Sequence, residues 1–388
     1  MGSRRRRLRL RLAMIAAIAL AGFGVLACTP SANPPSPART TPTHSGPSLG
    51  PTPTPSSHAT LPTATPSSSV GSFLETGPML VSRMWATATL LRDGSVLIAG
   101  GGGDDSGATA ELYDPRSGKF RPAGDMTTQR AWSAAVLLQD GKVLIVGDFY
   151  EGRGEVFDPT TNSFTPTAPL ISKERLACAA VALPDGRVLI AGGRSNNGYG
   201  VKTAETFDPA TGKFARTGSM SAGRSPFSAT LLRDGRVLVA GGSNDRSAEI
   251  LDPGTGRFTA TGSMMAVRDT FTSTMLVDGR VLFTGGRGSA GDLASAEIYD
   301  PATGRFAATG STSTPRSDHH AALLPDGRVL VTGAGADGSA ADLYDPASGT
   351  FETVGSGLPL PWGGTATTLL DGRVLIAGSD GTADLYRP

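Results

Sequence analysis

One short phrase recurs seven times after residue 85 and limits what this chain can fold into. In its fullest form it reads LLRDGRVLVAGG, at 231–242, and joins two apolar stretches through Asp-Gly. Asp-Gly between apolar segments is a strong β-hairpin signal, because glycine accepts the positive φ that a tight reversal requires. Each copy therefore predicts a hairpin, with turns at Asp93, Asp140, Asp185, Asp234, Asp278, Asp326 and Asp371.

Two more strand-like segments complete each repeat. AEILDP at 248–253 is an example of the first, and RFTATGS at 257–263 of the second. The DPGTG link between them combines a proline that presets φ with a glycine suited to a left-handed turn position. No segment has helical periodicity, so each repeat is predicted to be a four-stranded antiparallel meander. An aromatic residue opens the last segment at intervals of 44 to 50 residues: Phe73, Phe120, Phe164, Phe214, Phe258, Phe306 and Phe351.

Seven such units predict a β-propeller over residues 72–388, an all-β fold with seven four-stranded blades. One small sheet cannot cover its own faces, but seven packed radially cover one another. The segment around Phe73 stands alone, and the chain ends after an isolated set of three segments. We therefore expect this N-terminal segment to be the outer strand of the C-terminal blade and to close the ring.

A diglycine follows the second segment of several repeats, and a Tyr- or Phe-containing strand comes after it. This pattern resembles the kelch repeat. The pairs are Gly100 and Gly101, Gly192 and Gly193, Gly241 and Gly242, and Gly285 and Gly286. The pattern departs from the family where other residues follow Gly147, Gly333 and Gly378, and where phenylalanine stands in place of the usual tryptophan.

More distantly, the propeller resembles the middle domain of copper radical oxidases such as galactose oxidase. Those enzymes need two histidines, two tyrosines and a thioether cysteine. Here Cys178 lies in an alanine-rich apolar segment, where a small buried residue is expected. His319 and His320 are adjacent, so on a strand they would point to opposite faces. We expect neither a metal site nor a cofactor.

The first 71 residues read as an export signal followed by a stalk. Six arginines and a short apolar run occupy residues 1–27, and Val25, Leu26, Ala27 and Cys28 resemble a bacterial lipobox, which implies lipidation of Cys28. Residues 28–71 are rich in Thr, Pro and Ser and cannot bury a core. We expect a bacterial membrane lipoprotein whose lipid anchor holds an extracytoplasmic propeller.

Net charge and cysteine content limit the binding partners and the disulfide bonds that we expect for this chain. Loss of the six signal arginines leaves 29 basic against 34 acidic residues, which disfavours nucleic acid. With Cys28 assigned to lipid, Cys178 has no partner for an internal disulfide. We expect a monomer stabilised by packing alone.

Variation between the repeats concentrates in the loop after each diglycine position. In a meander, these loops lie on the face opposite the Asp-Gly turns, and loops on a rigid scaffold commonly carry binding specificity. Candidate ligand-binding residues in them are Tyr150, Arg153, Asn197 and Tyr199, which supply aromatic and hydrogen-bonding groups; solvated loops without a ligand remain an alternative.

An arginine precedes the first segment of six repeats, with Pro361 in the seventh. The six are Arg83, Arg130, Arg175, Arg224, Arg268 and Arg316. They are expected either to line the mouth of the propeller and bind carboxylates, or to bond backbone carbonyls of the neighbouring blade.

These features predict a cell-surface binding module that recognises a protein, peptide or glycan. No Ser, His and Asp constellation can be argued from two histidines in one repeat, so no catalytic residue is assigned. One alternative is an enzyme acting on an acidic sugar, as in the kelch-like sialic acid mutarotases, although that family has six blades. Another is a structural envelope protein without a small ligand.

Overall fold

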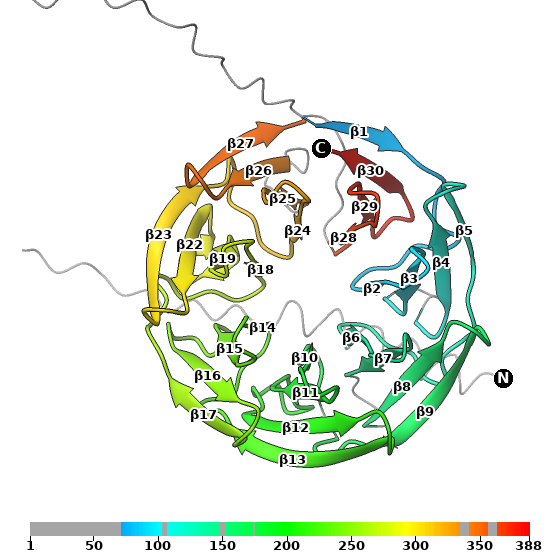
Figure 1. The fold of residues 1–388 in the computed structure, drawn as a ribbon, viewed down its shortest axis with the longest axis horizontal. Helices are drawn as coiled ribbons and strands as arrows, with labels where there is room; N and C mark the ends of the chain where they lie inside the picture. The colour runs from blue at the N-terminus through cyan, green and yellow to red at the C-terminus, as the bar shows by residue number, and fades with distance from the viewer. Residues whose placement is uncertain (1–70, 103–106, 148–151, 174, 334–340, 356–362) are drawn as a thin grey trace, which may run out of the picture. The chain divides into compact units, whose positions relative to one another are not determined.

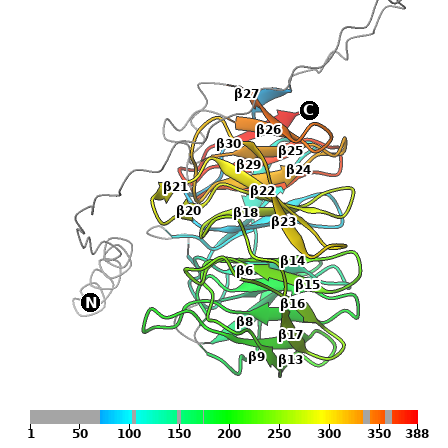
Figure 2. The same cartoon turned by 90° about the vertical axis from the view of Figure 1, so that its left-hand side faces the viewer.

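The computed structural model describes residues 71–102, 107–147, 152–173, 175–333, 341–355 and 363–388. Over these residues the secondary structure is entirely β, and seven four-stranded antiparallel sheets form the blades of a propeller (Figure 1). This confirms the predicted fold class. Figure 2 shows the same blades from the side.

The blades follow the chain in order. Blade one is β2 (Thr87–Leu90), β3 (Val96–Ala99), β4 (Ala110–Asp114) and β5 (Lys119–Pro122). Blade two is β6 (Ala134–Leu137), β7 (Val143–Val146), β8 (Arg153–Asp158) and β9 (Ser163–Pro169). Blade three is β10 (Ala179–Ala182), β11 (Val188–Ala191), β12 (Thr203–Asp208) and β13 (Lys213–Ser219). Blade four is β14 (Ser228–Leu231), β15 (Val237–Ala240), β16 (Ala248–Asp252) and β17 (Arg257–Ala260).

The remaining blades vary the same plan. Blade five is β18 (Thr272–Met275), β19 (Val281–Thr284), β22 (Ser295–Asp300) and β23 (Arg305–Ser311), and it carries a small extra hairpin of β20 (Arg287–Gly288) and β21 (Gly291–Asp292). Blade six is β24 (His320–Leu323), β25 (Val329–Thr332), β26 (Ala341–Asp345) and β27 (Thr350–Val354). Blade seven is β28 (Thr365–Thr368), β29 (Val374–Ala377) and β30 (Ala383–Arg387), with β1 (Ser72–Glu75) as its fourth strand.

The Asp-Gly turns join the first two strands of every blade. In blade one, the amide of Gly94 donates to the carbonyl of Leu91 at 3.1 Å, and Asp93 Oδ1 accepts the amide of Ser95 at 2.9 Å. The glycine φ lies between +85° and +91° in all seven turns. The side chain of aspartate thus fixes the turn, while glycine supplies the left-handed backbone.

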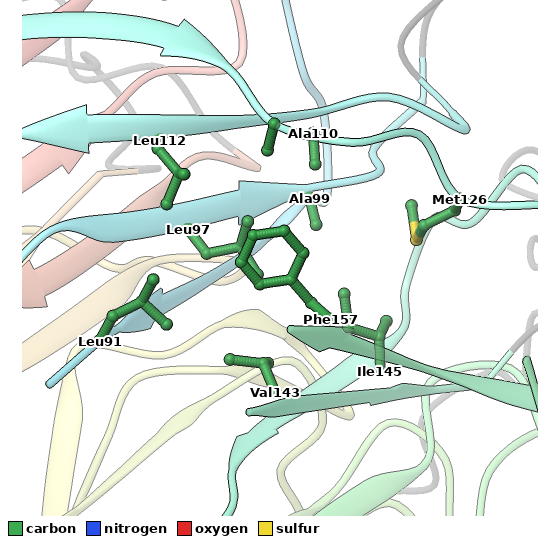
Figure 3. Packing of buried hydrophobic residues seen from close by; sticks show 10 residues of the cluster. Leu91, Leu97, Ala99, Ala110, Leu112, Met126, Val143, Ile145 and Phe157 are labelled. Carbon is green, nitrogen blue, oxygen red and sulfur yellow. The ribbon is translucent and has the colours of Figure 1, made fainter. Parts of the chain in front are cut away.

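Apolar cores lie between neighbouring blades. The core between blades one and two joins Leu97 and Leu112 to Val143, Ile145 and Phe157 (Figure 3). The second strand of every blade is buried along its whole length, as expected for a sheet covered on both faces. The blades therefore depend on one another for burial.

The N-terminal strand pairs with the last strand of the chain. β1 and β30 are antiparallel and in register from Ser72 opposite Arg387 to Glu75 opposite Asp384. The rings of Phe73 and Tyr386 lie 5.0 Å apart, an aromatic pair that recurs between the two outer strands of most blades. The segment around Phe73 is thus an outer strand in the C-terminal blade.

Candidate functional site

The six repeated arginines lie inside the blades. Each pairs with a carboxylate on the third strand of its own blade, at N to O distances of 2.5 to 3.1 Å, and no arginine side chain is more than 2% exposed. The partners, in order along the chain, are Glu111, Glu155, Glu205, Glu249, Glu297 and Asp342.

Blade three shows the complete arrangement. Arg175 donates from Nε to Glu205 Oε1 at 2.9 Å and from Nη1 to the carbonyls of Gly192 and Thr203, both at 2.8 Å. Nη2 donates to Thr203 Oγ1 at 2.9 Å, and Glu205 Oε2 accepts the amide of Ile171 at 2.8 Å. We call this set of acceptors the guanidinium socket.

These contacts correct the expectation of an arginine-lined mouth. The guanidinium groups are covered, and carbonyls of their own blade, rather than of the neighbouring one, accept their hydrogen bonds. A buried guanidinium needs a carboxylate to offset its desolvation. The acidic residue at the same position of every third segment was the sequence signal for this pairing.

The diglycines also have a packing role. In blade four, a Cβ on Gly241 would lie 2.4 Å from Cε1 of Phe271, which comes from blade five. In blade five, a Cβ on Gly285 would lie 2.8 Å from Cε1 of His319 in blade six. The first glycine thus leaves room for a side chain of the next blade.

A ring of residues surrounds the centre of the propeller just before the innermost strands β2, β6, β10, β14, β18, β24 and β28 (Figure 1). We call it the mouth ring. It occupies the second position after each of the six repeated arginines and after Pro361 in the seventh repeat, and its members are Trp85, Trp132, Ala177, Pro226, Thr270, Asp318 and Gly363.

Backbone hydrogen bonds join successive members of the mouth ring. Trp85 donates its amide to the carbonyl of Gly363 at 2.8 Å, Trp132 to that of Trp85 at 3.2 Å, and Asp318 to that of Thr270 at 2.9 Å. Five non-glycine members have φ between +47° and +58°. Left-handed backbone at bulky residues is costly and is enriched at functional sites.

Two tryptophans of adjacent blades stack in this ring. The centroids of Trp85 and Trp132 lie 4.6 Å apart with an interplanar angle of 31°, and both side chains are partly exposed. Such a pair offers a large, rigid apolar surface at low conformational cost.

Acidic groups gather at the same level on blades five and six. Burial raises the pKa of Asp318 to about 6, with nearby Asp269 and Asp292 opposing ionisation and Arg287 favouring it. Burial also raises the pKa of Asp269. Arg287 Nε donates to Asp292 Oδ1 at 3.0 Å at the base of the β20–β21 hairpin. Blades five and six lie across the ring from blades one and two (Figure 1).

The predicted loop residues lie on the same side as the mouth ring. Met84 and Asp269 each precede a ring member by one residue. Met84 forms a β-bridge with Gly102, and Asp269 forms one with Arg287, at the start of the variable loop of the same blade. Tyr199 is 76% exposed, and its carbonyl accepts the amide of Ser195 at 3.0 Å in a tight loop.

The other loop candidates are divided between two blades. Asn197 is exposed in the same blade-three loop as Tyr199, and Arg153 is exposed at the start of β8 in neighbouring blade two. Tyr150 lies outside the described residues. The mouth ring was not predicted from the sequence as a unit; the signal that could have indicated it is the occurrence of tryptophan at the same repeat position in two successive blades, at Trp85 and Trp132.

His319, His320 and Cys178 serve packing. His319 is buried, and its Nε2 lies 3.1 Å from the hydroxyls of both Thr272 and Thr284 of blade five. Burial lowers the pKa of His319 well below its usual value and that of His320 to about 4. Cys178 is also buried. In the described ranges, no three His, Cys, Asp or Glu residues are grouped as metal ligands.

A depression in the surface lies away from the mouth ring, on the side of the Asp-Gly turns. This shallow depression of about 490 Å³ on the Asp-Gly side is lined by Pro325, Asp371, Arg373 and neighbouring residues. We place the candidate site at the mouth ring instead, because Asp371 and Arg373 already satisfy each other in an ion pair.

No helix long and apolar enough to cross a membrane occurs in the part of the chain that the structure describes.

Comparison with known proteins agrees with this geometry. The Kelch motif model matches residues 175–221, which span blade three. A solved structure described as a novel fungal alcohol oxidase of the AA5 family, in complex with copper, has a TM-score of 0.69 at 20% identity, covering 82% of this chain and 76% of that chain. No curated protein matches the sequence significantly. The chain is thus a seven-bladed β-propeller whose third blade matches the Kelch motif.

Proposed function

We propose that this protein is a lipid-anchored bacterial binding module that recognises a protein, peptide or glycan at its mouth ring. The kelch-like propeller fold supports a role as a protein-interaction module. The observation that carries the proposal is the mouth ring, where strained backbone holds the tryptophan pair opposite the partly buried Asp318 and Asp269.

The chemistry of the ring favours a ligand with an apolar or sugar face and hydrogen-bond donors. Trp85 and Trp132 would stack on the apolar or sugar face of the ligand. The carboxylates of Asp269 and Asp318 would accept hydrogen bonds from its donors. Tyr199, Asn197 and the other exposed loop groups would extend the contact beyond the ring. The variable loops then select among ligands.

The same chemistry argues against the acidic-sugar enzyme. That alternative needs open guanidinium groups to hold a carboxylate, and the six repeated arginines are buried inside the blades, each paired with a carboxylate. Arg287 is exposed but is paired with Asp292 among further acidic groups.

The proposed location rests on the N-terminal sequence. The arginine-rich apolar segment 1–27 would direct export, Cys28 would carry the lipid, and the Thr, Pro and Ser-rich residues 28–71 would separate the propeller from the membrane. Metabolic labelling with a palmitate analogue should mark the wild-type protein and not Cys28→Ser.

The binding test uses peptide and glycan arrays probed with the purified protein. Trp132→Ala and Asp318→Asn should each weaken retention of the ligands that the wild type binds. The matched control is Asp234→Asn, which removes an exposed carboxylate from an Asp-Gly turn on the other side of the blades. Equal binding by all four proteins would refute a site at the mouth ring.

A further inference from the structure

The variable loop after β11 contains the only asparagine of the chain that is followed by glycine, Asn197 before Gly198. This pair can react with itself, because glycine lacks the Cβ that would shield its amide nitrogen from the preceding side chain. The nitrogen of Gly198 then attacks Cγ of Asn197 and closes a five-membered succinimide ring. The rate depends on how the fold holds these two groups.

Asn197 lies in a tight, exposed loop. The amide of Gly198 donates to the carbonyl of Ser195 at 2.9 Å, and the φ of Gly198 is +82°. The hydroxyl of Ser195 donates to the carbonyl of Tyr199 at 3.1 Å. The side chain of Asn197 is exposed and forms no hydrogen bond with the residues that the structure describes. Its amide carbon is therefore open to attack.

The Asp-Gly turns hold the corresponding side chain in place. Their glycine amide is engaged in the same way, as from Gly235 to the carbonyl of Leu232 at 3.0 Å. The side chain differs, because Asp234 Oδ1 accepts the amide of Arg236 at 3.0 Å and Oδ2 accepts Arg236 Nε at 2.8 Å. The hydrogen bond from the Arg236 side chain lowers the pKa of Asp234. Since attack needs a neutral carboxyl group, this ionised and clamped aspartate is protected.

A guanidinium group lies beside the reacting peptide. Arg194 Nε donates to the carbonyl of Gly198 at 3.2 Å. A nearby positive charge favours the deprotonated form of an acidic group. It therefore promotes loss of the amide proton of Gly198, which precedes attack, and it favours a negatively charged product. The loop thus joins a free electrophile to a charge that assists the nucleophile.

We propose that Asn197 is a site of spontaneous deamidation, which converts it to aspartate and isoaspartate. Gly198 N bonds to Asn197 Cγ, the bond from Cγ to Nδ2 breaks, and the side-chain amino group leaves as ammonia with the amide proton of Gly198. Water then opens the succinimide at either carbonyl carbon. The hydrogen bond from Gly198 to Ser195 must break first, and exposed loops open locally at low free-energy cost.

The reaction changes the surface of the loop in two ways. A carboxylate replaces a neutral amide two residues before Tyr199, and in isoaspartate the main chain gains one methylene group before Gly198. An effect of these changes on ligand binding rests on the proposed function, whereas the deamidation itself does not. The two are therefore tested separately.

The test incubates the purified full-length protein at mildly alkaline pH and follows its peptides by liquid chromatography and mass spectrometry. The peptide with Asn197 should gain the mass expected when OH replaces NH2 and should separate into two products. Its conversion should be about tenfold or more faster than conversion of Asn196, or than isomerisation of Asp234. Asn196 is the matched control, because it lies in the same loop and is followed by a residue with a side chain.

Two variants and an unfolded reference complete the test. Asn197→Gln would need a larger ring and should stay intact, and Arg194→Gln should slow conversion of Asn197 about threefold. Guanidinium chloride should expose the Asp-Gly turns, so that isomerisation of Asp234 speeds up on unfolding. Conversion of Asn197 no faster than that of Asn196, or an intact Asn197 in the folded protein under conditions that convert the unfolded one, would overturn the proposal.

Discussion

Arg175 and Glu205 form an ion pair with Nε and Oε1 2.9 Å apart, and each side chain is only 1% exposed. Five other blades repeat the pair. The arginine lies just before the innermost strand of its blade, and its acidic partner lies on the third strand, so the ion pair joins these two parts of the blade. The repeated charges therefore hold the blade together rather than facing a ligand.

Removing one partner should therefore destabilise the fold strongly. Glu205→Gln leaves the guanidinium of Arg175 buried without a countercharge and should lower the free energy of unfolding by about 3 kcal/mol. Urea denaturation followed by circular dichroism measures the loss. Asp185→Asn, which breaks the exposed pair with Arg187, should cost about 1 kcal/mol or less. Similar losses in both variants would contradict the assigned role.

The N-terminal strand is expected to fasten the ring. Deletion of residues 72–80 removes β1, its pairing with β30 and the contact of Phe73 with Tyr386. Because each core lies between two blades, loosening blade seven also exposes its neighbours. The truncated protein should melt at a clearly lower temperature in differential scanning calorimetry. A truncated form that melts like the full chain would show that β1 is dispensable.

The first glycine of the diglycine should tolerate no side chain. In Gly241→Ala the new methyl group would lie 2.4 Å from Cε1 of Phe271, and φ is +74°. Gly212 has a similar φ of +66° but nothing within 4 Å of an added Cβ. Gly212→Ala should thus show backbone strain alone, about 1 kcal/mol, and Gly241→Ala a larger loss in urea unfolding. Equal losses would exclude the packing role.

Stability should respond to the carboxyl group of Asp318. The pKa of this group is raised to about 6 in the folded protein, so folding favours its protonated form. Its stabilising contribution is complete below the unfolded pKa near 3.8 and is lost as pH rises through 6. Relative to wild type, Asp318→Asn should therefore gain stability between pH 4.5 and pH 7.5. A constant difference across this range would contradict the raised pKa.

Much of the architecture was predictable because its signals are local and repeated. The Asp-Gly turn at Gly94, the outer strand at Phe73 and the number of blades follow from turn chemistry and strand patterns. A structural role for Arg175, with bonds to backbone carbonyls, was one of two expectations, but its ion pair with Glu205 was not predicted, since the repeated arginine was considered without the acidic residue that shares its period. The mouth ring depends on hydrogen bonds between blades, such as that from Trp132 to Trp85, and no segment encodes these alone.

The central claim is that ligands bind at the mouth ring, and intrinsic fluorescence tests it directly. The chain has three tryptophans, and two of them, Trp85 and Trp132, form the stacked pair. Titration with a ligand selected on the arrays should change the emission of the wild type saturably, and Asp318→Asn should weaken the measured affinity about tenfold. An unchanged emission at saturating ligand, or undiminished affinity in Asp318→Asn and Trp132→Ala, would contradict the claim.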